Sequence, residues 1–504
     1  MNNNNKNPRQ LRPWVKWTLG VIAAGAVGLG VYHFSSENAS SADLVGGIDN
    51  FIGWAPGVAM NEGLDANKES RMYNEFGLAL KINVIGEVPQ QIAALMSGDV
   101  DFIFTTTDIS PIMMEEGSDL VQIEAQQFLE IVDSRGGDVL VVDESISTIE
   151  QLRGKKIACA LGWPSNTMLD IILKAGGLTE DDVKIINYDS PTKAKDAYVS
   201  RNVDACVVWS PDNFVCLDAR PSRELITTAD MPNTIVDVLV AKKSTLEKKK
   251  DAFVKLAKGW LTANAEVQTQ GNYEWAAKAY KKAFQAEDSV SDIVEGLKGF
   301  RFSTYGDNLN FFGLNPEYTG ITGGDIYNRM SRVYKHGYGN DLKNVVPWTK
   351  ACNTSILEGV SGLDGDMHQA EGPIQFAAAT DAEKTATAVM TKRVTVNFAV
   401  NSAKLEPSEK RAIRSAIGNT ANQFSTMRIR VEGNTDNTGP RELNIRLSKE
   451  RAQSVVDFLV SEYNFDPQRF IVIGNGPDKP VASNDNEAGR AANRRTDFEF
   501  VSAQ

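Results

Sequence analysis

The sequence predicts an α/β protein in which a two-lobed middle region is followed by a separate, compact C-terminal domain. Three observations support this fold class. Strand-like and helix-like segments alternate between about residues 43 and 365, one strand-containing unit occurs twice there, and a second alternating region begins after a stretch poor in large apolar residues. With 504 residues, 42% of them hydrophobic, the chain can bury two or three separate cores.

Charge and histidine content exclude some function classes. The net charge of -12 argues against a nucleic-acid-binding protein, which would carry a basic surface. His33, His336 and His368 have no spacing typical of a metal or catalytic site. We therefore predict no metal, no cofactor and no catalytic residues, and expect that the protein is not an enzyme.

The first element is a hydrophobic segment near the N-terminus. Residues 1–17 carry four basic side chains and no acidic one, and residues 18–36 carry no Asp, Glu, Lys or Arg. Trp17 and Tyr32 lie near the two ends of the apolar run. This pattern predicts a cytoplasmic tail (1–17) and a transmembrane anchor (18–36) in the inner membrane of a Gram-negative bacterium, with the rest of the chain in the periplasm. A signal peptide cleaved after Ala42 is the alternative, because small residues follow the run.

The middle region, 43–365, consists of short apolar runs separated by amphipathic helices. Helices are expected between the strands, for example at residues 89–98 and 165–177, and the pattern becomes helical after about residue 241. Strands are expected at residues 80–87, 100–106, 137–143, 155–161, 183–188 and 203–209. Alternation of this kind predicts largely parallel sheets.

An internal similarity divides this region into two related lobes. "ALMSGDVDFIFTTTD" (94–108) and "AYVSRNVDACVVWSPD" (197–212) share a helix end, a turn, Val-Asp, a short apolar strand and a polar cluster that ends in Asp. Each copy therefore predicts a polar loop at the carboxyl end of a strand, where α/β proteins bind ligands.

The clearest local binding motif in the lobes is "GWPSNTM" (162–168). A strand ends just before it, and the loop delivers Trp163, Ser165, Asn166 and Thr167 to a helix N-terminus. The unpaired amides and the dipole of a helix N-terminus favour an anion. The alternative is that Ser165 or Thr167 only caps the helix.

Other residues at strand ends are further candidates for solute contact. They are Trp54, Thr106, Asp108, Trp209 and Asp212, and for each of them a packing or turn role is the alternative. Tryptophans and acids suit a cationic ligand, whereas the helix end suits a sulfonate, carboxylate or nitrate, so the charge of the solute stays open. Arg135 either clamps an anionic ligand or forms a salt bridge at the crossing between the lobes.

Three blocks of the middle region resemble the nitrate/sulfonate/taurine type of periplasmic solute-binding protein. They are "SGDVDFIFTTTD", the run from "SRGGDVLVVDES" through "LRGKKIACALGWPSNTM" to "KIINYDS", and "RNVDACVVWSPD". The resemblance implies a two-lobed fold of the type II kind, with a small solute held in the cleft between the lobes. It also implies delivery of that solute to an ABC permease, or sensing of it.

The C-terminal domain, 391–504, follows an expected linker at 366–390. In "MRIRVEG" (427–433) apolar and charged residues alternate, which predicts a strand with one buried face, ended by Gly433. On the next helix Asn444, Ser448 and Arg451 form one polar stripe, which begins beside the acid-bearing loop "NTDNTG".

An acid and an arginine in this arrangement can bind the two ends of a zwitterion. Asp436 can accept hydrogen bonds from an ammonium group, and Arg451 can hold a carboxylate through two parallel hydrogen bonds. The alternative is an internal salt bridge between these two residues with no ligand.

The domain resembles the OmpA C-terminal peptidoglycan-binding family, also found at the ends of flagellar-motor stator proteins and peptidoglycan-associated lipoproteins. The resemblance rests on "VNFAVNSAKL", "VEGNTDNTGPRELNIRLSKERAQSVVDFL", "GNGPDKPVASND" and "GRAANRRTDFEF". It implies that Asp436 and Arg451 bind the diaminopimelate of the peptidoglycan stem peptide, with Asn444, Leu447 and Arg494 in the same pocket. Asn434 and Thr496 depart from the usual histidine and aliphatic residue.

The combined prediction is a membrane-tethered solute-binding protein anchored to peptidoglycan. A structural envelope linker with a non-functional cleft is the alternative. An enzyme akin to the pyrimidine-synthesising relatives of this fold is disfavoured, because the sequence lacks their reactive histidine and cysteine-rich motif. Cys206 and Cys216 are the only closely spaced cysteines, and buried inert thiols are favoured over a bridge between them.

Overall fold

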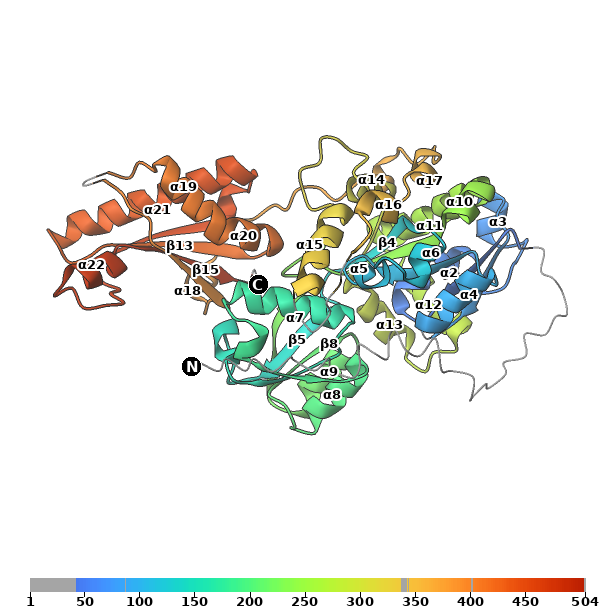
Figure 1. Cartoon of the computed structure of the whole chain (residues 1–504), viewed down its shortest axis with the longest axis horizontal. Coiled ribbons are helices and arrows are strands. Elements are labelled where there is room, and N and C mark those ends of the chain that lie inside the picture. Colours follow the sequence, from blue (N-terminus) through green and yellow to red (C-terminus); the bar gives the residue numbers. More distant parts are fainter. Residues whose placement is uncertain (1–41, 87, 337–341, 343, 400–401, 503–504) are drawn as a thin grey trace, which may run out of the picture. The chain divides into compact units, whose positions relative to one another are not determined.

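The computed structural model describes residues 42–86, 88–336, 342, 344–399 and 402–502. These residues form two compact units (Figure 1). The first unit comprises the chain up to residue 131 with 237–293 and 302–370, and the second comprises 132–236, 294–301 and 371–504. The predicted N-terminal tail and transmembrane anchor lie outside the described residues. Inside them, no helix is both long enough and apolar enough for a membrane crossing.

The first unit is built on a mixed six-stranded sheet with the order β11-β4-β10-β3-β1-β2. Strand β1 runs parallel to both β2 and β3, whereas β10 runs antiparallel to β3. The strands are β1 (Leu44–Ile48), β2 (Leu80–Val84), β3 (Phe102–Thr106), β4 (Ala125–Ser134), β10 (Val236–Lys242) and β11 (Phe300–Phe302). The chain passes from one unit to the other inside β4, β10 and β11.

The helices of the first unit surround this sheet. They are α2 (Ala55–Met60), α3 (Arg71–Phe76), α4 (Val88–Ser97), α5 (Ser110–Met113), α6 (Asp119–Gln122), α10 (Lys243–Lys248), α11 (Lys250–Gln270), α12 (Tyr273–Phe284), α13 (Val290–Leu297), α14 (Tyr305–Phe311), α15 (Gly323–His336), α16 (Trp348–Ala351) and α17 (Ser355–Glu358), with α13 continuing into the second unit. Apolar faces of α2 and α11 supply much of the core, including Trp54 just before α2 and Trp260 on α11.

The second lobe, residues 132–236, contains a five-stranded sheet with the order β7-β6-β8-β5-β9. The strands are β5 (Asp138–Asp143), β6 (Lys156–Cys159), β7 (Lys184–Asn187), β8 (Ala205–Trp209) and β9 (Ser222–Thr227). Helix α7 (Pro164–Ala175) covers one face, and α8 (Pro191–Val199) and α9 (Asp212–Ala219) cover the other (Figure 1).

The predicted repeat is confirmed by the topology of the two sheets. The orders β2-β1-β3-β10 and β7-β6-β8-β5 match strand for strand, with β3 and β8 as the repeated strands. In each, the first three strands are parallel and the fourth is antiparallel. The expectation of largely parallel sheets was therefore only partly right, because β5, β9 and β10 are antiparallel strands.

The C-terminal domain, residues 371–502 of the described chain, has a four-stranded sheet with the order β12-β15-β13-β14. The strands are β12 (Met390–Val394), β13 (Arg428–Asn434), β14 (Phe470–Gly476) and β15 (Thr496–Val501), and the helices are α18 (Asp381–Thr385), α19 (Pro407–Ile413), α20 (Asn419–Gln423), α21 (Arg441–Tyr463) and α22 (Glu487–Asn493). Strand β12 ends at Val394.

Strand β13 is buried on both faces, not on one as predicted. Its two arginines, Arg428 and Arg430, contact the segment expected to be a linker. Arg428 forms an ion pair of 2.5 Å with Glu383 of that segment and lies over the ring of Phe376. The second half of 366–390 is thus packed onto the C-terminal sheet, because the charges of β13 need partners once they are removed from water.

Two glycines allow helix α21 to lie close against the sheet. A Cβ at Gly433 would meet the carbonyl oxygen of Ser448 at 2.1 Å, and one at Gly474 would meet that of Ile445 at 2.6 Å. Gly433 does not end β13, which continues to Asn434. Its role is to bring the polar residues of α21 beside the loop that follows β13.

Candidate functional site

Asp436 lies on the loop after β13, and its carboxylate is held from two sides. Its Oδ1 accepts a hydrogen bond from the backbone N–H of Thr438 at 2.8 Å, and its Oδ2 accepts one from Nη1 of Arg494 at 2.7 Å. Burial acts to raise the pKa of Asp436, but these two hydrogen bonds outweigh it and hold the pKa below its usual value. The side chain is therefore an anion with a fixed orientation.

Arg451 lies on α21 and is oriented by backbone oxygens and a ring. Its Nε donates to the carbonyl of Ser402 at 3.0 Å, its Nη2 donates to that of Ala399 at 3.3 Å, and the guanidinium lies 4.9 Å from the ring centre of Phe398. Burial lowers the pKa of Arg451, while the charge of Asp436 acts to raise it. An arginine nevertheless stays charged at any physiological pH.

The expected alternative, an internal salt bridge between Asp436 and Arg451, is wrong. The carboxylate pairs with Arg494 instead, and among the described residues none offers Arg451 a carboxylate within 4.0 Å. A carboxylate has about four acceptor positions and a guanidinium five donors. In the described part of the chain, two positions of Asp436 and two N–H groups of Arg451 are occupied.

The remaining donors of Arg451 include a pair that can bind a carboxylate. Since its Nε and one N–H of Nη2 are occupied, one further N–H on Nη2 and two on Nη1 have no hydrogen-bond partner among the described residues. The Nη1 and Nη2 groups project in parallel and can hold both oxygens of one carboxylate. Asp436 offers an acceptor and Arg451 a donor pair, which matches the two ends of a zwitterion.

The other predicted residues of this site fall around the same loop. The Nδ2 of Asn444 donates a hydrogen bond to the carbonyl of Thr438 at 3.0 Å, and this bond stabilises the turn that holds Asp436. Leu447 is half-buried on the next turn of α21. Arg494, at the end of α22, joins Asp436 to Glu487, and these hydrogen bonds raise its pKa.

Ser448 departs from the expected polar stripe. It is fully buried, donates to the carbonyl of Ile445 and accepts a hydrogen bond from the backbone N–H of Gly476 at 2.9 Å. It therefore ties α21 to the end of β14 and is not open to a ligand. Asn434 donates to Asp497 at 3.2 Å, and Thr496 is buried in β15, so both unusual residues are accommodated inside the sheet.

The loop "GWPSNTM" in the second lobe leads into α7 as predicted. Gly162 adopts a φ of +84°, which favours glycine, and its N–H donates to the side chain of Asn166 at 3.2 Å. Trp163 is the N-cap and its side chain does not cap the helix, and the hydroxyl of Ser165 does not cap it either. The hydroxyl of Ser165 and the Nδ2 of Asn166 are fully buried and have no hydrogen-bond partner among the described residues.

Trp209 lies beside this loop, whereas Asp212 does not contribute to it. The rings of Trp163 and Trp209 are both half-buried, and their centres are 6.0 Å apart. Asp212 accepts a hydrogen bond from Thr192 at 2.9 Å and forms an ion pair of 3.2 Å with Lys195. Its carboxylate is thus engaged by α8, which leaves donors and aromatic rings at the N-terminus of α7.

In the first unit the candidates have different surroundings. Trp54 is fully buried between Phe104 and Trp260, and its indole N–H donates to Asp49 at 2.8 Å, so packing accounts for it. Thr106, the last residue of β3, is buried, and its hydroxyl has no hydrogen-bond partner within the described chain. Asp108 is fully buried two residues further on.

Arg135 forms salt bridges and does not point to a free anion site. Its guanidinium pairs with Asp133 and, at 2.7 Å, with Glu371. The described residues contain no group of three or more His, Cys, Asp or Glu side chains placed to hold a metal ion.

Three supporting residues of the C-terminal site were not found from the sequence. Phe398 under Arg451, Glu487 beside Arg494 and the Thr438 N–H all contact predicted residues. Phe398 and Glu487 are distant in the chain from the residues they support. Only Thr438 had a local signal, since an Asp two residues before a turn N–H commonly accepts from it.

Comparison with known proteins agrees with this division of the chain. Residues 397–494 match the OmpA family and residues 66–268 match the family described as NMT1/THI5 like. Outer membrane protein A of Bordetella avium is 33% identical over 178 residues, which are 34% of this chain and 84% of that protein. Omp38 of Acinetobacter baumannii is 37% identical over 123 residues, 24% of this chain, and the chain spans only 34% of its length.

The middle region also has similar proteins. A Brucella abortus protein described only as a binding protein is 25% identical over 207 residues, 39% of this chain and 62% of that protein. The crystal structure of the periplasmic aliphatic sulphonate binding protein SsuA from Escherichia coli covers 61% of this chain and 96% of its own, with 19% identity and a TM-score of 0.47. The chain therefore belongs to the OmpA family through its C-terminal domain, and its middle region is NMT1/THI5 like.

Proposed function

We propose that the protein is a small-molecule receptor held at the cell wall. Its C-terminal domain binds the diaminopimelate of the peptidoglycan stem peptide, and its middle region binds a small anionic solute. The observation that carries the first part is the open donor pair of Arg451 in the same charged cluster as an anionic Asp436.

The charges of this cluster favour a zwitterionic ligand. Glu487, Arg494, Asp436 and Arg451 carry two negative and two positive charges, so the cluster is neutral as a whole. A ligand with one ammonium and one carboxylate adds no net charge and satisfies both open groups. The free end of diaminopimelate has these two groups on one carbon atom, whereas a lysine side chain at the same place lacks the carboxylate.

Pull-down of the full chain on isolated sacculi tests this part. Wild type is expected to sediment with diaminopimelate-type peptidoglycan and to bind lysine-type peptidoglycan much less. Asp436→Ala and Arg451→Ala are expected to sediment much less with the diaminopimelate type than wild type does. Undiminished sedimentation of both variants would show that the ligand is held elsewhere.

The second part, binding of an anionic solute, is supported by the N-terminus of α7. The helix carries no side-chain cap, and buried donors of Ser165 and Asn166 lie at its start. Donors and a helix dipole suit a sulfonate or nitrate. An amine is less suited, because the carboxylate of Asp212 is already paired with Lys195. We further propose that the middle region delivers its solute to an ABC permease and that the protein is attached to the inner membrane.

Calorimetry of the full chain against methanesulfonate, nitrate and an alkylamine tests the solute. Heat is expected with an anion, and Asn166→Asp, which places a negative charge at the helix start, is expected to abolish it. Ser190→Ala is the matched control, because Ser190 caps α8 in the same lobe through the Lys193 N–H. No heat with any probe would favour the structural linker with a non-functional cleft.

A further inference from the structure

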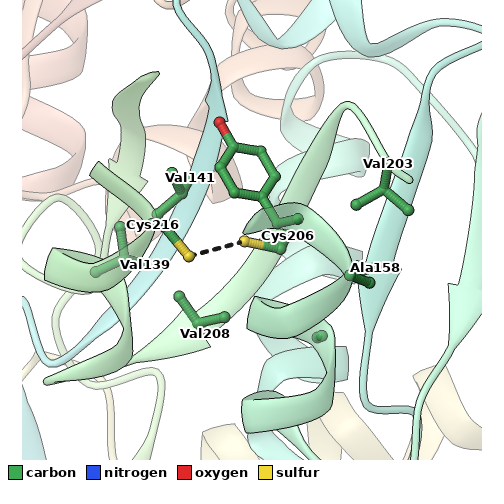
Figure 2. Packing of buried hydrophobic residues seen from close by; sticks show 10 residues of the cluster. Val139, Val141, Ala158, Val203, Cys206, Val208 and Cys216 are labelled. Carbon is green, nitrogen blue, oxygen red and sulfur yellow. Dashed lines mark hydrogen bonds between the residues drawn. The ribbon is translucent and has the colours of Figure 1, made fainter. Parts of the chain in front are cut away.

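Two cysteine sulfurs lie close together in the core of the second lobe. Cys206 is the second residue of β8 and Cys216 is on α9, and their Sγ atoms are 3.7 Å apart (Figure 2). Both side chains are fully buried, with Val139, Val141 and Val208 around them. The other two cysteines lie on separate elements, Cys159 at the end of β6 and Cys352 just after α16.

From this geometry we propose that Cys206 and Cys216 form a redox-active pair that closes to a disulfide. A disulfide requires sulfurs about 2.05 Å apart, so the two atoms need to approach by less than 2 Å from their 3.7 Å separation. The side chains already point toward each other from adjacent elements, as Figure 2 shows. A small rotation of either side chain, together with a slight shift of the short helix α9, supplies the approach.

The surroundings favour one of the two sulfurs as the attacking group. The sulfurs of Cys206 and Cys216 share a hydrogen bond, which lowers the pKa of Cys216, and the positive charges of Lys195 and Arg220 act in the same direction. Burial raises the pKa of Cys206. Since the thiolate is the nucleophile in disulfide exchange, Cys216 attacks first.

The oxidant is a small disulfide such as oxidised glutathione. The Cys216 thiolate attacks one of its sulfurs, the S–S bond of the oxidant breaks, and one glutathione thiol leaves. Cys206 then loses its proton and attacks the Cys216 sulfur of the mixed disulfide, and the second glutathione thiol leaves. Two protein thiols are oxidised and one small disulfide is reduced to two thiols. Because both sulfurs are fully buried, the exchange takes place either before β8 and α9 pack, when either sulfur can attack first, or when α9 opens from the folded lobe, where Cys216 is the favoured nucleophile.

The bridge would close a short loop that contains a candidate binding residue. Cys206 and Cys216 are ten positions apart, and Trp209, whose ring lies 6.0 Å from that of Trp163, is between them. The oxidised pair would therefore restrain the segment that carries Trp209. The disulfide itself does not depend on whether the lobe binds a solute.

Mass spectrometry of the full chain tests the proposal. The chain is unfolded, refolded with oxidised and reduced glutathione, unfolded again without reductant, and alkylated with iodoacetamide. Trypsin places both cysteines in one peptide, 202–223, because Arg220 precedes a proline. We expect this peptide to be about 2 Da lighter than its reduced form and unalkylated, while Cys159 and Cys352 are alkylated.

Two outcomes would overturn the proposal. One is alkylation of all four cysteines even with excess oxidised glutathione, and the other is a bridge from Cys206 or Cys216 to Cys159 or Cys352. Cys216→Ser is expected to leave Cys206 alkylated, with Cys159→Ser as the matched buried control that keeps the bridge. The mass of the wild-type peptide decides the question even if a serine variant folds poorly.

Discussion

Replacement of Arg451 by alanine should weaken binding to peptidoglycan without unfolding the domain. The structure gives the guanidinium two separate tasks. One edge donates to the carbonyls of Ser402 and Ala399 and lies over Phe398, and the other edge has no partner in the described part of the chain and can take a ligand carboxylate. Only the second edge takes part in binding.

The magnitude follows from the hydrogen bonds at that open edge. A hydrogen bond to a charged group contributes about 1.5–3 kcal/mol, and 1.4 kcal/mol corresponds to a tenfold change in affinity. Loss of the carboxylate contact should therefore raise the dissociation constant about ten- to 150-fold. Arg451→Lys should fall between wild type and Arg451→Ala, because lysine keeps the charge but has no parallel donor pair.

The assay is equilibrium sedimentation with increasing amounts of diaminopimelate-type sacculi, with circular dichroism to confirm folding. Arg446→Ala is the matched control. Arg446 lies on the same helix, its side chain is 72% exposed, and its partner is the exposed Glu450 at 3.7 Å. A folded Arg451→Ala protein that binds within about threefold of wild type would refute the reasoning, since that change is below 1 kcal/mol.

Three other measurements probe the pH range, the packing and the redox pair. The hydrogen bonds to Asp436 lower the pKa of this carboxyl group in the folded protein. Peptidoglycan binding should therefore persist when the pH falls below the ordinary aspartate pKa of about 3.9, and be lost only as the pH falls through the lowered pKa. A sedimentation midpoint above about pH 5 would contradict this. Gly433→Ala places a Cβ 2.1 Å from a backbone oxygen of α21 and should lower the free energy of unfolding in urea by about 1–3 kcal/mol. Gly372→Ala, where a Cβ would have no atom within 4 Å, should leave it unchanged. Equal stability of the two variants would argue against the close approach of α21 to β13. A disulfide between Cys206 and Cys216, ten positions apart, should raise the free energy of unfolding of the oxidised chain by about 2.7 kcal/mol. An identical urea midpoint with and without reductant would contradict this expectation.

Local patterns in the sequence predicted the elements well. The runs at 80–87, 137–143 and 203–209 became β2, β5 and β8, because each is a short apolar segment bounded by turn residues. The repeated Val-Asp unit also predicted equivalent strands in both sheets. What failed was strand direction, since β5 and β10 are antiparallel and their partners are distant in the chain.

The same limit applies to the sites. Asp436 and Arg451 could be recognised from type and spacing, but the partner of the acid could not. Arg494 lies 58 positions away from Asp436, and only the tertiary structure brings it within 2.7 Å. The burial of β13 by 376–386 was likewise hidden, because a segment poor in apolar residues can still pack through ion pairs such as Glu383 with Arg428.

The ion pair of Asp436 with Arg494 changes how the wall site should work. If Asp436 and Arg451 bridged each other, a ligand would have to break a salt bridge before binding. Instead Arg494 pairs with Asp436 and is itself held by Glu487, so that within residues 402–502 and the other described ranges Arg451 keeps an unoccupied donor pair and Asp436 keeps unoccupied acceptor positions. A pre-oriented site of this kind loses little free energy to rearrangement on binding. The second arginine is thus a positioning residue for the acid, and its loss should weaken recognition of the ammonium end more than that of the carboxylate end.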